Sequence, residues 1–162
     1  MARAAPKAGL RPYLPADAPV LAAIYQASIE ELTGDDYSTA QQAAWAEAAD
    51  DPAAFGAELA GDLTLVATLE GSPAAFASLR GNDQIRMLYV HPAAAGQGLA
   101  ALLVDALEKL AAARGARRLT VDASDTAEGF FARRGYQPQA RLTVPRGGEW
   151  LGSTRMEKAV GG

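Results

Sequence analysis

A glycine-containing loop between a predicted strand and a predicted helix is the stretch best suited to bind a ligand. Gly96 and Gly98 follow an apolar run that ends at Val90. From Leu99 onward, apolar residues recur at the spacing of one buried helical face. The first turn of a helix leaves backbone N–H groups unpaired, and the helix dipole adds partial positive charge, so such a loop can bind phosphate or pyrophosphate. A tight turn that needs glycine only for its geometry is an equally good interpretation.

Several other kinds of site are excluded by residues that the chain lacks. No Gly-Lys-Ser/Thr follows the loop, which excludes a Walker A phosphate site. Two glycines without an early β-α-β unit make only a weak dinucleotide-binding pattern. The absence of cysteine excludes disulfides, thiolate metal ligands and a cysteine nucleophile, and a single histidine, His91, argues against a histidine-built metal site. We therefore expect no metal.

Length and composition indicate one globular domain. The chain has 162 residues, of which 49% are hydrophobic and 21% charged, and its net charge of −4 comes without a basic block. These values argue against a nucleic-acid or anionic-membrane partner. No apolar run approaches the ~20 residues needed to span a bilayer. We expect residues 1–9 to form a loose tail, residues 10–160 to form the domain, and the protein to be cytoplasmic.

Apolar periodicity and turn residues predict the elements that must position the loop. Ser38 and Gln41 form a capping-box pattern that opens a helix, and a crossover between 84–90 and 117–122 predicts that these two strands are parallel. The order predicts one mixed, mostly antiparallel α/β sheet. The predicted strands are 10–14, 63–69, 74–80, 84–90, 117–122, 137–144 and 150–158, and the predicted helices are 17–33, 38–49, 51–59, 99–114 and a short one capped by Asp125.

This order, together with three segments, resembles the GNAT superfamily of acyl-CoA-dependent N-acetyltransferases. The segments are 87–92 (Met-Leu-Tyr-Val-His-Pro), 96–100 (Gly-Gln-Gly-Leu-Ala) and 130–136 (Phe-Phe-Ala-Arg-Arg-Gly-Tyr), and the likeness spans Leu10 to Lys158. Residues 123–136 also look like a bacterial branch that carries Ala-Ser-x-Thr-Ala-x-x-Phe-Phe-x-Arg-x-Gly. The resemblance implies a GNAT fold whose sheet of about seven strands is splayed at the fourth and fifth strands.

By this resemblance the cofactor is acetyl-CoA. The family's phosphate loop, Arg/Gln-x-x-Gly-x-Gly/Ala, falls on residues 95–100, where Ala95 replaces the usual Arg or Gln and predicts a weakened site. Pantetheine would lie in the splay and the pyrophosphate on the loop amides. Arg133 could reach CoA phosphates or simply face solvent. The implied cofactor-binding residues are Leu88, Tyr89, Val90, Gly96, Gln97, Gly98, Leu99, Ala100, Ala101, Ser124, Phe131 and Arg133.

The resemblance also raises the question of which group protonates the departing thiolate. Many family members have a tyrosine at the position of Phe131, which has no hydroxyl. Another donor (Tyr37, Tyr89 or Tyr136), a water molecule or an absence of catalysis would each account for this, and in the bacterial branch phenylalanine is normal. Asp122, at a strand end beside the splay, is the better carboxylate. The expected catalytic residues are therefore Tyr37, Asp122 and Tyr136.

The first two helices cover the acceptor side in the family, so Glu30, Tyr37 and Trp45 are the expected acceptor-binding residues. Core packing is the stronger alternative for Trp45 and a solvated surface position for Glu30. The sequence thus predicts an acetyltransferase that acts on a small amine. A non-catalytic acyl-CoA sensor and a protein N-terminal or lysine acetyltransferase are the alternatives, and a homodimer is an expectation from the family alone.

Overall fold

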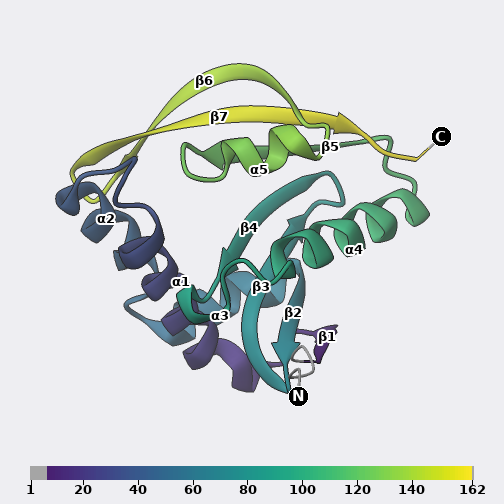
Figure 1. Cartoon of the computed structure of the whole chain (residues 1–162), viewed down its shortest axis with the longest axis horizontal. Coiled ribbons are helices and arrows are strands. Elements are labelled where there is room, and N and C mark those ends of the chain that lie inside the picture. The colour runs from purple at the N-terminus through teal and green to yellow at the C-terminus, as the bar shows by residue number, and fades with distance from the viewer. Residues whose placement is uncertain (1–6, 162) are drawn as a thin grey trace, which may run out of the picture.

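Seven strands form one sheet in the order β1-β2-β3-β4-β5-β7-β6, and only β4 and β5 are parallel (Figure 1). The computed structural model describes residues 7–161. The mixed, mostly antiparallel sheet with flanking helices is confirmed. Its elements are β1 (Ala8–Pro12), α1 (Ala18–Leu32), α2 (Thr39–Ala46), α3 (Pro52–Gly61), β2 (Leu63–Leu69), β3 (Ser72–Arg80), β4 (Gln84–Val90), α4 (Leu99–Ala113), β5 (Arg118–Ser124), α5 (Glu128–Arg133), β6 (Gln137–Arg146) and β7 (Glu149–Ala159).

The bounds of several elements differ by a few residues from the sequence-based expectations, and the start of β1 and the cap of α5 have clear physical causes. Ala8 and Gly9, expected in a loose tail, begin β1 and pair with β2, because backbone pairing at a sheet edge needs no apolar side-chain pattern. Residues 1–6 of that tail lie outside the described residues. Asp125 does not cap α5, since its carboxylate pairs with Arg141, and the Ser124 hydroxyl accepts the Ala127 N–H at 3.1 Å instead.

Other local predictions are confirmed by the hydrogen bonds. The Ser38 hydroxyl accepts the Gln41 N–H at 3.1 Å and the Gln41 side chain accepts the Ser38 N–H at 2.9 Å, so the capping box opens α2. Strand β4 has the predicted bounds. None of the helices in the described part of the chain is both long and apolar enough to cross a membrane.

The sheet separates two hydrophobic cores. On one face α4 buries its leucine side, including Leu99, Leu103 and Leu107, against the sheet. On the other face α1 and α3 bury an aromatic cluster that includes Tyr25 and Phe55. Each face is covered by amphipathic helices, so apolar burial holds the sheet from both sides.

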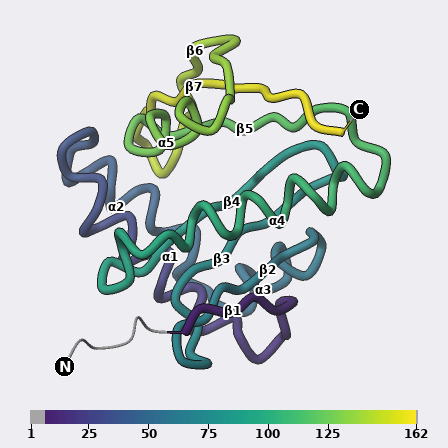
Figure 2. Tube along the Cα trace, turned by 45° about the vertical axis from the view of Figure 1, so that its right-hand side comes forward, coloured from purple at the N-terminus to yellow at the C-terminus, as the bar shows by residue number. Residues whose placement is uncertain are grey.

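The two halves of the sheet part between β4 and β5. These strands pair only at Gln84 with Thr120 and at Ile85 with Val121, although both continue for several residues beyond. Two views show the β5–β7–β6 half diverging from the β1–β4 half (Figures 1 and 2). The register of β3 and β4 also shifts, so Arg86 is an extra residue in a β-bulge beside the splay. On the side that faces β5, the backbone of β4 is therefore unpaired from residue 86 onward.

Candidate functional site

A cleft of about 260 Å³ occupies the space where β4 and β5 part. Residues of β4, β5, the α1–α2 region and the β6–β7 hairpin line it. The sequence-predicted residues that line it are Tyr37, Trp45, Leu88, Tyr89, Asp122, Ser124 and Phe131. The structure thus brings together seven of the expected site residues from five separate segments.

The glycine loop at the start of α4 has the geometry of an anion site. Gly96 and Gly98 have φ values of 80° and 79°, which favour glycine. A Cβ at either position would meet nothing within 4 Å, so space is open in front of the helix. The first intrahelical bond runs from Leu102 N–H to Gly98 C=O at 3.1 Å, which leaves the preceding amides of the first turn without helical partners. The loop therefore fits a phosphate or pyrophosphate group.

His91 holds the entry to this loop. Its N–H donates to the Ala74 carbonyl at 2.8 Å, and its ring Nδ1 accepts the Ala93 N–H at 3.0 Å. Both contacts are with the backbone, so this histidine fixes the chain at the start of the loop. Within residues 7–161, the His, Asp and Glu side chains form no group of three that could hold a metal ion.

Tyr37 spans the cleft from the α1–α2 loop. Its hydroxyl donates to the Gly152 carbonyl at 2.6 Å and accepts the Asp125 N–H at 2.9 Å. Next to it, the Thr126 hydroxyl donates to Asp36 at 2.8 Å. Burial raises the pKa of Tyr37, and the Asp125 N–H opposes that rise. The side chain is therefore a protonated hydroxyl, held between β7 and the β5–α5 loop at neutral pH.

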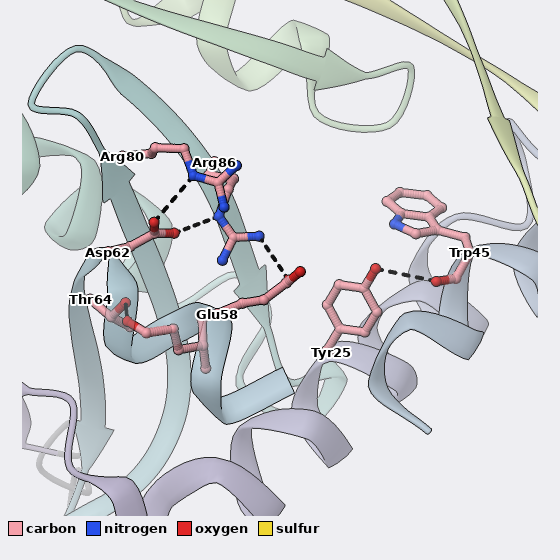
Figure 3. Close-up of polar contacts among 8 residues, drawn as sticks. Tyr25, Trp45, Glu58, Asp62, Thr64, Arg80 and Arg86 are labelled. Atoms are coloured by element: carbon pink, nitrogen blue, oxygen red, sulfur yellow. Dashed lines mark hydrogen bonds and ion pairs between the residues drawn. The ribbon is translucent and has the colours of Figure 1, made fainter. Parts of the chain in front are cut away.

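Tyr89 and Trp45 form an aromatic wall on the α1 side of the cleft. The Tyr89 ring lies 4.5 Å from Tyr25 and 6.3 Å from Trp45, centroid to centroid. The Tyr25 hydroxyl donates to the Trp45 carbonyl at 3.2 Å, which anchors α2 to α1 (Figure 3). Burial raises the pKa of Tyr89. Trp45 is 7% exposed and packs in the core, and it also lines the cleft, so its role in binding an acceptor stays a prediction.

Asp122 and Tyr136, two of the predicted catalytic residues, are each bound to another side chain. Asp122 lines the cleft but forms a two-point ion pair with Arg155, at 2.9 and 3.3 Å. Tyr136 is 2% exposed, and its hydroxyl donates to Glu108 at 2.9 Å, outside the cleft lining. Glu30, in contrast, is exposed, and it also lies outside the cleft lining. The splay thus brings Asp122 to the cleft but neither Tyr136 nor Glu30.

The cofactor-side residues divide between the loop and the cleft. Phe131 is 1% exposed and forms part of the cleft wall. Arg133, on the exposed side of α5, does not line the cleft. Val90 lies on the part of β4 that has no partner on the β5 side. The edge of β4 and the glycine loop are consecutive in the chain, so one extended ligand could contact both.

Sequence reasoning missed two polar side chains of the hairpin that line the cleft. They are Arg146 and Ser153, and the Ser153 hydroxyl is buried without a hydrogen-bond partner in the described structure. Arg146 lies in a Pro-Arg-Gly-Gly segment that indicates only a turn. No local signal could have placed either residue in the site, because the hairpin reaches it by sheet pairing.

A second missed feature is a group of ion pairs beside the bulge of β4. Asp62, at the end of α3, has a side chain only 3% exposed and pairs with both Arg80 and Arg86. Arg86 also pairs with Glu58 at 3.2 Å (Figure 3). These contacts fix the side chain of Arg86, a residue that lines the cleft. The bulge and its charges are therefore part of the frame of the site.

Comparisons with known proteins agree with this architecture. Residues 33–160 match the model of the acetyltransferase (GNAT) domain family. The uncharacterized N-acetyltransferase YafP of Escherichia coli K12 is 34% identical over 142 residues, 88% of this chain and 89% of that protein. The crystal structure of a GCN5-related N-acetyltransferase from Rhodopseudomonas palustris is 60% identical, has a TM-score of 0.93 and covers 99% of both chains.

More distant structures share the fold. The PaiA N-acetyltransferase of Thermoplasma acidophilum, solved in complex with coenzyme A, has a TM-score of 0.78 at 17% identity, over 94% of this chain and 99% of that one. The family match covers most of the chain, as do the two relatives above 30% identity. This chain therefore belongs to the GNAT family and is an N-acetyltransferase.

Proposed function

We propose that this protein transfers the acetyl group of acetyl-CoA to an amine of a small-molecule acceptor by direct attack in a ternary complex. The observation that carries the proposal is the parting of β4 and β5 immediately before the glycine loop. It places an unpaired strand edge, a cleft of about 260 Å³ and a helix N-terminus in succession. A concave cleft favours a small acceptor, whereas a protein acceptor would need an open groove.

The residues of the loop and of β4 fit the cofactor. Backbone amides from Gly96 to Ala101 would hold the pyrophosphate, which does not require the basic side chain that Ala95 lacks. The edge of β4 at 88–90 would pair with the amides of the pantetheine arm, as one strand pairs with another. Ser124 and Phe131 would flank its thioester end, and Arg133 would reach the phosphates from α5.

Acetyl-CoA supplies the acetyl group: the amine nitrogen bonds to the carbonyl carbon, the carbon–sulfur bond breaks, the nitrogen loses a proton and the sulfur gains one. The unpaired β4 amides offer a donor to the carbonyl oxygen. Tyr37 and Tyr89 are the cleft hydroxyls, and the raised pKa of each keeps it protonated at neutral pH. Either could protonate the sulfur, although the Tyr37 proton must first leave the Gly152 carbonyl, whereas the Tyr136 hydroxyl lies outside the cleft and donates to Glu108.

Fewer cleft residues could accept the proton of the amine than could donate a proton to the sulfur. Asp122 is the carboxylate that lines the cleft, and it is paired with Arg155. We assign Asp122 to attract the acceptor's ammonium group, with the proton leaving through solvent. Direct attack requires both substrates to be bound together, so proximity supplies much of the rate enhancement.

The test is CoA release from acetyl-CoA with a panel of small amines, for the wild type, Gly98→Trp and Gly71→Trp. Both glycines have positive φ (79° and 82°), and a Cβ at each meets nothing within 4 Å. The two substitutions therefore impose the same backbone strain, but only Gly98→Trp fills the space before α4. We expect it to abolish release and Gly71→Trp to retain it. Binding of acetyl-CoA without release from any amine would instead indicate a sensor.

A further inference from the structure

Arg146 brings an exposed positive charge to the cleft, and the Glu47 carboxylate, which approaches the next residue Gly147, forms no ion pair with it in the described residues. The charged residues that line the cleft are Arg86, Asp122 and Arg146. Arg86 is paired with Asp62 and Glu58, and Asp122 is paired with Arg155. Among residues 7–161, Arg146 takes part in no ion pair. An anionic ligand group would therefore gain more at Arg146 than at the other two residues.

The position of Arg146 separates it from the expected pyrophosphate site. Its charge acts on the hydroxyls of Tyr25 and Tyr89, where it opposes the larger rise in pKa that burial causes. Both tyrosines belong to the core on the α1 face of the sheet, whereas α4 and its loop pack on the opposite face. The anion that Arg146 would hold is therefore not the pyrophosphate on the glycine loop.

The hairpin that carries Arg146 is fixed against α2. The Gln41 side chain donates to the Trp150 carbonyl at 2.8 Å. Gly147 approaches α2 so closely that a Cβ there would lie 3.1 Å from Ala44 Cβ. Figure 1 shows the β6–β7 turn beside α2. The backbone at Arg146 is thus held in place before any ligand binds, which lowers the entropic cost of binding.

The walls around Arg146 are apolar and aromatic. Trp45, Met87, Tyr89, Val144 and Leu151 line the cleft with it. A planar guanidinium at the edge of an apolar cleft suits a carboxylate on an apolar frame, because the pair can form two parallel hydrogen bonds while the frame packs on the rings.

We propose that the acceptor is an amine that also carries a carboxylate on an apolar or aromatic frame, and that Arg146 binds this carboxylate. The inference rests on the proposed acetyl transfer and names the class of its acceptor. The amine end would then point toward the splay and Asp122. An acceptor without the carboxylate would leave the charge of Arg146 unmatched.

The first experiment compares phenylalanine, phenylalaninamide and phenethylamine as acceptors for the wild type and Arg146→Gln. We expect the wild type to prefer phenylalanine. Arg146→Gln should raise the KM for phenylalanine about 10- to 100-fold, the range for one charge-assisted pair. It should leave the KM for phenethylamine and for acetyl-CoA unchanged. Arg118→Gln is the control, since this exposed arginine pairs with Glu157 and does not line the cleft.

A binding measurement keeps the inference testable if none of the three amines reacts. The chain has two tryptophans, so Trp150→Phe leaves Trp45 in the cleft as the sole tryptophan reporter. In this background we expect 3-phenylpropionate to quench its fluorescence at lower concentration than 3-phenylpropanamide, and Arg146→Gln to remove the difference.

The outcomes separate the two proposals. Turnover of amines without preference for a carboxylate, or equal binding of the acid and the amide, overturns the inference while acetyl transfer stands. A rise in the KM for acetyl-CoA in Arg146→Gln also overturns it, since Arg146 would then serve the cofactor. Preferential binding of 3-phenylpropionate without CoA release from any tested amine supports the anion site and counts against the proposed acetyl transfer.

Discussion

At the scale of single residues, Tyr37 joins three segments that are distant in the chain. Its hydroxyl connects the α1–α2 loop to Gly152 of β7 and to the Asp125 amide. The same hydroxyl lines the cleft. One side chain therefore joins the segments around the site. This bridging role and the proposed role as proton donor can be separated by measuring stability and turnover in the same variant.

Tyr37→Phe should lower the free energy of unfolding by about 1–3 kcal/mol, because it leaves a buried carbonyl and an amide without their partner. If Tyr37 is also the acid, kcat should fall about 100-fold. Urea unfolding and CoA release measure the two effects. Tyr25→Phe is the control, since it removes a buried hydroxyl that donates to the Trp45 carbonyl and does not line the cleft. Unchanged stability in Tyr37→Phe would contradict the bridging role.

At the scale of elements, ion pairs tie the end of α3 to the bulge of β4. The Asp62 carboxylate lies between Arg80 and Arg86, and the Arg86 side chain is 14% exposed (Figure 3). A bulge interrupts the backbone pairing of β3 with β4. The side-chain ion pairs therefore help to hold β4 in place at this point. The site depends on this region because the bulge lies at the start of the splay.

Asp62→Ala should reduce the free energy of unfolding by about 3–5 kcal/mol, since it leaves the Arg86 guanidinium largely buried with one partner fewer. Glu157→Ala, which breaks the exposed pair with Arg118, should cost about 1 kcal/mol or less. Guanidinium chloride titrations of both variants make the comparison. Similar losses in the two variants would show that the cluster beside the bulge is no more important than a surface pair.

At the scale of the whole molecule, the two cores contain tyrosines that are neutral in the folded state. Burial raises the pKa of Tyr25 in the core on the α1 face and of Tyr136 in the core under α4. In the unfolded chain each would ionise near its ordinary value of about 10. Above that pH the folded state binds more protons than the unfolded state, so stability must fall as pH rises.

The expected slope is about 1.4 kcal/mol per pH unit for each such tyrosine above pH ~10. Tyr136→Phe should remove one tyrosine's share of the slope, whatever it does to stability at neutral pH. Urea unfolding at several pH values between about 9 and 11.5 gives both slopes. A wild-type stability that stays constant across this range would contradict the burial of these hydroxyls.

Much of the architecture could be predicted from local patterns. The leucine spacing of α4, the Ser38–Gln41 capping box and the bounds of β4 all depend on residues close together in the chain. The order of elements and the three motif segments indicated the GNAT family, which the family match confirms. Local patterns did not predict the start of β1 at Ala8, which depends on pairing with β2, or the loss of Asp125 as a cap of α5, which depends on its pairing with Arg141.

The sequence by itself thus indicated the family and the N-acetyltransferase activity through the resemblance of three motif segments, and it indicated the glycine loop through residues in succession. Only the tertiary structure decided which side chains share the cleft. It paired Asp122 with Arg155 and Tyr136 with Glu108, and brought Arg146 beside Tyr89. The physical reason is that each contact joins elements distant in the chain. Pairing of β5 with β7 sets Asp122 opposite Arg155, whereas packing of α4 brings Glu108 to Tyr136. No local spacing encodes the charge or hydrogen-bond partner that a side chain will meet there.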